Sequence, residues 1–197
     1  VNNAQQRLIR HSLAVSPAPA QQASTADVFG NMRCFFSLQS THEQLTVHAD
    51  SVVVTNSIRE TPDSTVIWEA VRERFRYKAG GAFDSASEFV FASPYVPRHP
   101  DFLDYARPSF GAGAPLMAAA QDLMSRSTHV NTPALEALAQ RKGVCQDFAH
   151  IMLACLRAMG LAARYVSGYL LTEPPPGQPR LTGSDASHAW VSVYIPD

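Results

Sequence analysis

The sequence feature that most constrains the fold is the segment 141–160, RKGVCQDFAHIMLACLRAMG. Its apolar residues recur at the spacing of one helical face. They are Cys145, Phe148, Ala149, Met152, Cys155, Leu156 and Met159. Gly160 predicts the end of this helix, because glycine readily takes the left-handed conformation that follows a last helical turn. The pattern therefore predicts a helix with one face in the core and a cysteine in its first turn.

Cys145 is expected where the first backbone N–H groups of this helix lack intrahelical partners, at the positive end of the helix dipole. Such surroundings favour the thiolate, which is the nucleophilic form of cysteine. A lone cysteine on an apolar helix face is, however, more often a small packing residue. The position in the first turn and the residues downstream favour the reactive interpretation.

The composition excludes several classes of protein. The 197 residues are 46% hydrophobic and 17% charged, which indicates a folded chain. The net charge is −1 and no basic run occurs, so we expect neither nucleic acid nor an anionic membrane as partner. No apolar run has the length that a transmembrane helix needs.

The number and spacing of the cysteines indicate whether the cellular compartment is oxidising or reducing. The three cysteines are odd in number and dispersed, which argues against a disulfide framework and for a reducing compartment. The first residues, VNNAQQRLIR, lack the pattern of a secretory signal, although a leader upstream stays an open alternative. We therefore expect a cytoplasmic protein.

Two domains are expected, 1–60 and 61–197. In the first, residues 6–15, 32–38 and 45–55 carry β-type patterns and predict a small antiparallel sheet or sandwich, with Cys34 in its core. The periodicity changes near the Thr-Pro-Asp sequence at 61–63, which suits a boundary.

The second domain mixes helices and strands. Residues 68–77 fit either a final strand or a short helix, and we favour the strand. Residues 80–115 are rich in proline, glycine and aromatic side chains, which predicts an extended segment with short helical turns. Further helices are expected over 115–125 and 132–140, and strands over 163–171 and 187–195, with an exposed proline-rich loop at 173–179.

His188 opens the last predicted strand and is the candidate partner of Cys145. A catalytic thiol needs a base or ion-pair partner, and imidazole titrates in the useful range. A histidine at the start of a strand packed on the cysteine helix can meet the start of that helix. The alternative is a partly exposed strand-end residue. Trp190 alternates to the same strand face and either shields the site or packs in the core.

His150 follows Cys145 by five residues, about 140° around the helix, so we expect its side chain to point elsewhere. A metal site of Cys145, His150 and Cys155 fails for the same reason and lacks the ligand spacing of zinc sites. Neither a metal nor a cofactor is predicted.

Three blocks, GVCQDFAH (143–150), ARYVSGY (163–169) and DASHAWVSVYIP (185–196), together resemble the transglutaminase-like cysteine-enzyme superfamily, specifically its bacterial branch. The stretches QRLIRHSLAVSP and GNMRCFFSL resemble that branch's N-terminal β domain, so the resemblance covers nearly the whole chain. It implies an α+β fold with an N-terminal antiparallel β domain and a papain-like core, here truncated at its C-terminal end.

The resemblance also implies a Cys-His-Asp triad, with Cys145 as nucleophile and His188 as base. The backbone N–H of Cys145 is expected to contribute to the oxyanion hole. The family's orienting aspartate lies on the strand after the histidine strand, so we expect it beyond Asp197. We interpret Asp185 as a turn residue and Asp147 as a helix-start or buried structural carboxylate.

These roles predict a thiol hydrolase, a cysteine protease or amidase that forms a thioester with a peptide or protein substrate. The alternatives are a non-catalytic peptide- or protein-binding module and a protein-glutamine acyltransferase. No acyl-acceptor site is evident, so hydrolysis is favoured over crosslinking. The family carries a further helical segment near residues 126–127. Either this protein lacks that segment or the 197 residues omit it, and we favour the second.

Overall fold

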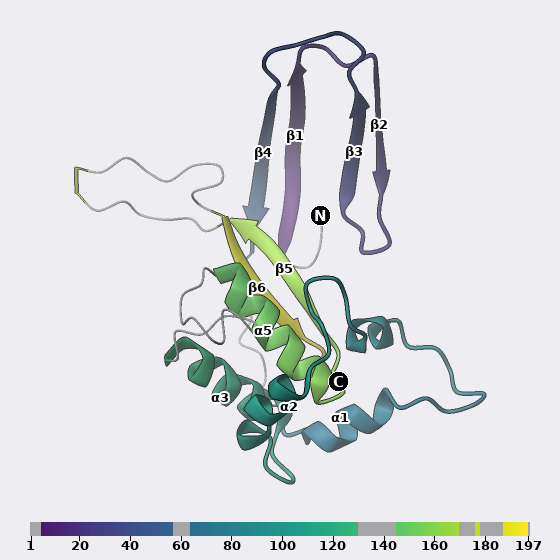
Figure 1. Ribbon diagram of the computed structural model, residues 1–197, viewed down its shortest axis with the longest axis vertical. Helices are drawn as coiled ribbons and strands as arrows, with labels where there is room; N and C mark the ends of the chain where they lie inside the picture. The colour runs from purple at the N-terminus through teal and green to yellow at the C-terminus, as the bar shows by residue number, and fades with distance from the viewer. Residues whose placement is uncertain (1–4, 57–63, 130–144, 170–175, 178–186, 197) are drawn as a thin grey trace. The chain divides into compact units, whose positions relative to one another are not determined.

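The computed structural model describes residues 5–56, 64–129, 145–169, 176–177 and 187–196. The chain divides into two compact units, Val1–Thr61 and Pro62–Asp197. The described part of the first unit is built from antiparallel strands, and that of the second from helices and a β-hairpin (Figure 1). The fold is therefore α+β, as the sequence predicts.

The first unit contains two antiparallel strand pairs. Its strands are β1 (Gln6–Ser16), β2 (Gln21–Ala26), β3 (Met32–Ser37) and β4 (Thr46–Thr55). β1 pairs with β4, and β2 pairs with β3. The turn between β2 and β3 is closed by the Asp27 carboxylate, which accepts hydrogen bonds from the backbone N–H groups of Phe29 and Asn31 at 2.9 and 2.8 Å. The predicted strands are confirmed, and β2 is an addition.

The prediction of a core position for Cys34 is wrong. Its side chain is half-buried, and its Sγ lies 3.4 Å from Nε2 of Gln22 on the neighbouring strand. None of the described residues of this unit is fully buried. The physical reason is that a two-stranded ladder covers a side chain from the sides but has no second layer across its face.

The second unit begins with a helical region. Its elements are α1 (Trp68–Arg74), the 3₁₀ helix η1 (Ser85–Val90), α2 (Pro100–Ala106), the 3₁₀ helix η2 (Arg107–Ser109), α3 (Leu116–His129) and α5 (Cys145–Ala158). α3 confirms the helix expected over 115–125, and η1, α2 and η2 are the short helical turns expected over 80–115. The helix expected over 132–140 lies outside the described residues.

The strand prediction for residues 68–77 is wrong, because this segment forms α1. Trp68 and Val71 are buried at helical i, i+3 spacing. The indole N–H of Trp68 donates to the carbonyl oxygen of Gly111 at 2.9 Å, and its ring meets Phe110 edge-on at 5.7 Å. The segment therefore has a helical face in the core, and it pairs with none of the described strands.

α5 and a β-hairpin form the part of the fold that positions the predicted site. α5 ends at Ala158, and Gly160 takes the expected left-handed conformation just after it, with a φ of +80°. The chain then turns back into β5 (Ala163–Tyr169), which pairs antiparallel with β6 (Ser187–Val193). Both predicted strands are confirmed. Most of the proline-rich loop between them lies outside the described residues, and Gly177 within it is exposed.

One face of the hairpin packs on the core that contains α5 (Figure 1). Cross-strand partners share a face, so the pairs Ala163↔Val193 and Tyr165↔Val191 form this inner face. The pairs Arg164↔Ser192, Val166↔Trp190 and Gly168↔His188 form the outer face. The largest fully buried side chains of the core are Phe102, Leu116, Leu123, Ile151, Leu153, Leu156 and Leu161.

Candidate active site

Cys145 is the first residue of the described α5, and its side chain is half-buried. On the facing strand, burial raises the pKa of Tyr165, and the charge of Cys145 raises it further. The thiol and the phenol are therefore near enough to interact electrostatically. Tyr165 belongs to the inner face of the hairpin, which packs on the core that contains α5.

An aromatic stack adjoins this position. The His150 ring lies between Tyr165, at 5.0 Å and 21° between planes, and Tyr95, at 5.7 Å and 19°. Desolvation lowers the pKa of His150, against an opposing effect of Asp147. Since the ordinary value is already below 7, the stacked imidazole is mostly neutral at pH 7. His150 points to Tyr165, and no hydrogen bond joins it to Cys145 within the described parts of the chain.

His188 is the second residue of β6 and is half-buried on the outer face. Its ring centroid lies 6.1 Å from that of Trp190, with 45° between the planes. The residue opposite His188 is Gly168, where an added Cβ would lie only 3.2 Å from Cζ3 of Trp190. Glycine thus makes room for the indole. Trp190 is 40% exposed and shares the face of His188, as predicted.

Cys145 and His188 lie at the same end of the layer that α5 forms with the hairpin. A short turn connects α5 to β5 and reverses the chain, so the start of α5 adjoins the end of β5 and the start of β6 (Figure 1). The register, however, puts His188 on the outer face, whereas Cys145 neighbours Tyr165 on the inner one. Among the described residues, no hydrogen bond joins the thiol to the imidazole.

The candidate carboxylates are only partly described. Asp147 lies in the first turn of α5, half-buried, where its charge acts on His150. Asp185 and Asp197 lie outside the described residues. The backbone N–H of Cys145 begins the described helix, and its role in an oxyanion hole stays a prediction.

The sequence analysis did not predict the stack of Tyr95, His150 and Tyr165, because it considered His150 only in relation to Cys145 and Cys155. The only available signal was the alternation that puts Tyr165 on one face of a strand next to the cysteine helix. In the part of the chain that is described, no group of three or more His, Cys, Asp or Glu side chains could hold a metal ion. No helix there is both long and apolar enough to cross a membrane.

Comparison with known proteins decides the family. Residues 118–197 match the family model of the transglutaminase-like superfamily, and residues 1–54 match that of the bacterial transglutaminase-like N-terminal region. An uncharacterized protein of Mycobacterium leprae is 30% identical over 205 residues, which cover 98% of this chain and 69% of that protein. The chain belongs to the transglutaminase-like superfamily.

Further similar proteins align over nearly the whole chain. Uncharacterized proteins of Mycobacterium bovis and Mycobacterium tuberculosis are 40% identical over 211 residues, covering 99% of this chain. The chain spans 65% of the length of these relatives. A crystal structure of a candidate cysteine protease from Cytophaga hutchinsonii aligns with a TM-score of 0.67 at 19% identity, over 99% of this chain and 64% of that one. This likeness shows a shared papain-like fold.

Proposed function

We propose that this protein is a thiol hydrolase, a cysteine protease or amidase that acts on a peptide or protein substrate through a thioester. One observation carries the proposal. The stretch that matches the superfamily core, residues 118–197, contains a cysteine at the start of α5 and a histidine at the adjoining end of the hairpin packed on that helix.

In the proposed reaction, Sγ of Cys145 attacks the carbonyl carbon of an amide, and the amide nitrogen leaves with a proton from His188. This yields a thioester and a free amine. His188 then takes a proton from water, whose oxygen attacks the thioester carbon, so that a carboxylic acid leaves and the thiol is restored. The backbone N–H of Cys145 donates to the oxyanion in both tetrahedral intermediates.

This mechanism sets a geometric requirement. The imidazole of His188 must reach the Cys145 thiol around the end of the hairpin, where Tyr169 pairs with Ser187. Cys145 and His188 lie at that end, and the proposal requires the start of β6 to rearrange so that the imidazole meets the thiol. Catalytic hydrogen bonds are often long in unliganded enzymes and shorten when substrate binds.

The register between β5 and β6 favours a second candidate function, that of a non-catalytic peptide-binding module. An outer-face His188 next to an exposed Trp190 forms a surface for binding a peptide without contact to the thiol. The two candidates differ in what they require of Cys145, because only the hydrolase needs a thiolate that depends on His188.

The test is the rate of iodoacetamide reaction with Cys145 as a function of pH, in a Cys34→Ser background. For a hydrolase we expect a midpoint well below pH 8 and a His188→Ala variant that reacts markedly more slowly at pH 7. Peptide or amide hydrolysis should disappear in Cys145→Ala and fall by about 10²–10⁴-fold in His188→Ala.

His48→Ala is the matched control, because His48 is an exposed histidine of the first unit. It should change neither the alkylation profile nor hydrolysis. If the midpoint lies near that of a free thiol and His188→Ala leaves it unchanged, the hydrolase proposal is wrong and the binding module stands.

A further inference from the structure

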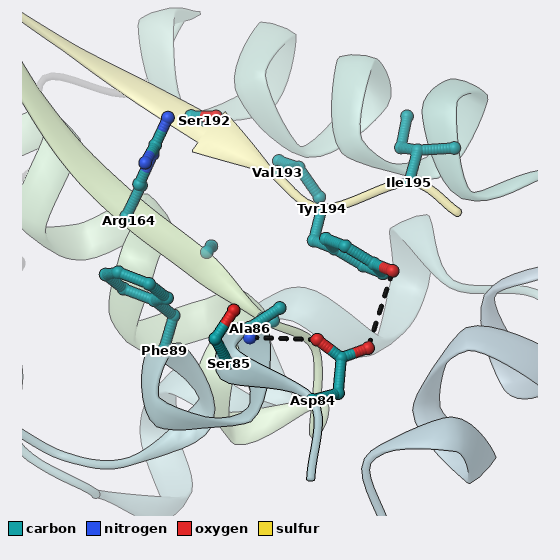
Figure 2. Close-up of a pocket in the computed structure, with 11 residues that line it drawn as sticks. Asp84, Ser85, Ala86, Phe89, Arg164, Ser192, Val193, Tyr194 and Ile195 are labelled. Atoms are coloured by element: carbon teal, nitrogen blue, oxygen red, sulfur yellow. Dashed lines mark hydrogen bonds between the residues drawn. The ribbon is translucent and has the colours of Figure 1, made fainter. Parts of the chain in front are cut away.

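A pocket with a volume of about 370 Å³ lies between η1 and the hairpin (Figure 2). Its walls come from η1, the start of β5 and the end of β6. They are formed by Asp84, Ser85, Ala86, Phe89, Ala162, Ala163, Arg164, Ser192, Val193, Tyr194 and Ile195. The pocket does not contain Cys145 or His188.

One end of the pocket carries an unpaired cation. Arg164 is exposed, is the cross-strand partner of Ser192, and lies with it and Phe89 on one side of the pocket in Figure 2. Among the described residues, the Arg164 guanidinium has neither an ion-pair nor a hydrogen-bond partner. A free guanidinium beside a hydroxyl and an aromatic ring is suited to bind a planar carboxylate.

The carboxylate at the other end of the pocket is already neutralised. Asp84 accepts hydrogen bonds from the N–H of Ala86 at 3.0 Å and from Nε of Arg74 at 3.0 Å, and the Tyr194 hydroxyl lies 3.5 Å away. The Ala86 N–H and the Arg74 guanidinium hold the pKa of Asp84 below its ordinary value. The remaining unpaired charge of the pocket is that of Arg164. Because Asp84 is paired with Arg74, the charge left for a ligand is the single positive charge of Arg164. That charge suits a ligand group with one negative charge.

The pocket lies at the end of the hairpin where β5 begins, and two of its residues, Arg164 and Ser192, are on the same outer face as His188, whereas Ala163 and Val193 are on the inner face. Along β6 the outer-face residues are His188, Trp190 and Ser192 in succession. At about 3.4 Å per strand residue, Ser192 is about 14 Å from His188, which an extended peptide covers in about four residues. Between them, Trp190 and Val166 form an exposed apolar step.

We propose that this pocket is a substrate subsite that binds the carboxylate of an aspartate or glutamate side chain, about four residues from the scissile amide, in a peptide extended along the outer face. This inference rests on the proposed function and names its substrate class, which is an acidic peptide. Arg164 supplies the charge and Phe89 packs against the aliphatic part of the acidic side chain.

The test uses the full chain with Cys145→Ala, so that binding is measured without turnover. Fluorescein-labelled decapeptides carry a single glutamate four residues before or after a central amide, or glutamine at the same place. We expect one glutamate peptide to bind about five-fold more tightly than its glutamine counterpart by fluorescence anisotropy, with a smaller preference at high salt.

Variants of the arginine make the test specific. Arg164→Ala should remove the preference, and Arg164→Glu should reverse it towards a lysine peptide. Arg107→Ala, which removes an exposed arginine of the same unit, should leave the preference unchanged. Circular dichroism verifies that each variant is folded.

Three outcomes overturn the subsite. These are equal binding of the glutamate and glutamine peptides, a preference that survives in Arg164→Ala, and the same preference with glutamate moved to two residues from the central amide. The proposed function fails separately. If native Cys145 is inert but the glutamate preference depends on Arg164, the pocket binds acidic peptides and the hydrolase proposal is wrong.

Discussion

Three cysteines of one chain lie in three different environments. Cys34 is half-buried on β3, Cys145 is half-buried at the start of α5, and Cys155 is completely buried about three turns further along the same helix. Burial raises the pKa of the Cys155 thiol to about 12. At pH 8 its thiolate fraction is therefore on the order of 10⁻⁴, so Cys155 is a packing residue.

The first prediction concerns which thiols react. Iodoacetamide at pH 8 should modify Cys34 and Cys145 in the folded protein and leave Cys155 unmodified, because both access and thiolate are lacking there. Mass spectrometry of tryptic peptides, with a urea-unfolded sample as positive control, measures this. Rapid labelling of Cys155 without urea would contradict the buried placement.

The second prediction concerns alkaline pH. The pKa of Cys155 is higher in the folded chain than the ordinary value of 9.0, so the unfolded chain loses its proton first as pH rises. The free energy of unfolding should therefore fall between about pH 9 and pH 12, by at most about 1.4 kcal/mol per pH unit from this thiol. Urea unfolding at several pH values tests this, and Cys155→Ala should show a shallower decline.

Arg157 connects three segments through one guanidinium. Nε and Nη2 donate to the carbonyl oxygen of Ala163 at 3.1 and 2.8 Å, and Nη1 donates to the carbonyl oxygen of Phe91 at 2.9 Å. Partial burial lowers its pKa, but an arginine stays charged at any ordinary pH. The side chain thus ties α5 to the start of β5 and to the segment after η1.

The third prediction follows from this contact. Arg157→Ala leaves two carbonyl groups without their partner and should lower the free energy of unfolding by about 1–3 kcal/mol. Arg157→Lys should recover little, because a single ammonium cannot reproduce the forked geometry. Arg107→Ala is the control and should change stability by less than about 0.5 kcal/mol. If Arg157→Ala and Arg107→Ala lower the free energy of unfolding in urea by the same amount, Arg157 does not stabilise the contact between these segments.

At the scale of elements, the end of α5 decides how the hairpin returns over the helix. Gly160 takes φ of +80°, and the N–H of Leu161 donates to the carbonyl oxygen of Leu156 at 3.0 Å. An added Cβ at Gly160 would lie 3.0 Å from Cγ of Arg72. Both the backbone conformation and the close approach of α1 therefore favour glycine here.

The fourth prediction separates the backbone strain at position 160 from the contact that an added Cβ would make with Arg72. Gly160→Ala should destabilise the protein by about 1–3 kcal/mol through backbone strain and the Arg72 contact. Gly113→Ala has a similar φ of +71° but no atom within 4 Å of the added Cβ, so it should incur the backbone cost alone. The difference between the two variants in thermal unfolding measures the contact with Arg72, and no difference would assign the whole effect to φ.

At the scale of the whole molecule, burial is unevenly distributed between the two units. Every fully buried side chain among the described residues lies in the second unit. The strands of the first unit leave large apolar side chains exposed, including Met32 at 67% and Phe35 at 57%. Substitutions of the same kind should therefore have very different effects in the two units.

The fifth prediction compares two phenylalanines. Phe102→Ala removes a side chain with no exposed surface and should lower the free energy of unfolding by about 3–5 kcal/mol. Phe35→Ala should cost less than about 0.5 kcal/mol. Far-UV circular dichroism in urea follows the strands of the first unit as well as the helices of the second, whereas the fluorescence of Trp68 and Trp190 reports the second unit alone. A cost above about 2 kcal/mol for Phe35→Ala would show that the face around Phe35 is buried.

Much of the architecture is determined by local sequence pattern. The apolar period of 141–160 predicts α5 and its end at Gly160, and alternation predicts β5, β6 and the strands of the first unit. Three sequence blocks indicate the superfamily, because a family resemblance depends on residue types and their order along the chain. Where two patterns overlap, as in residues 68–77, only the buried position of Trp68 distinguishes helix from strand.

Other features exist only in the tertiary structure. The sequence puts Trp190 and His188 on one face of a strand, but the register with β5 decides that this is the outer face, opposite Tyr165. The stack of His150 and the Arg164 pocket likewise join residues from separate segments. The physical reason is that helix and strand periods depend on neighbours along the chain, whereas faces, stacks and pockets depend on which distant segments come into contact.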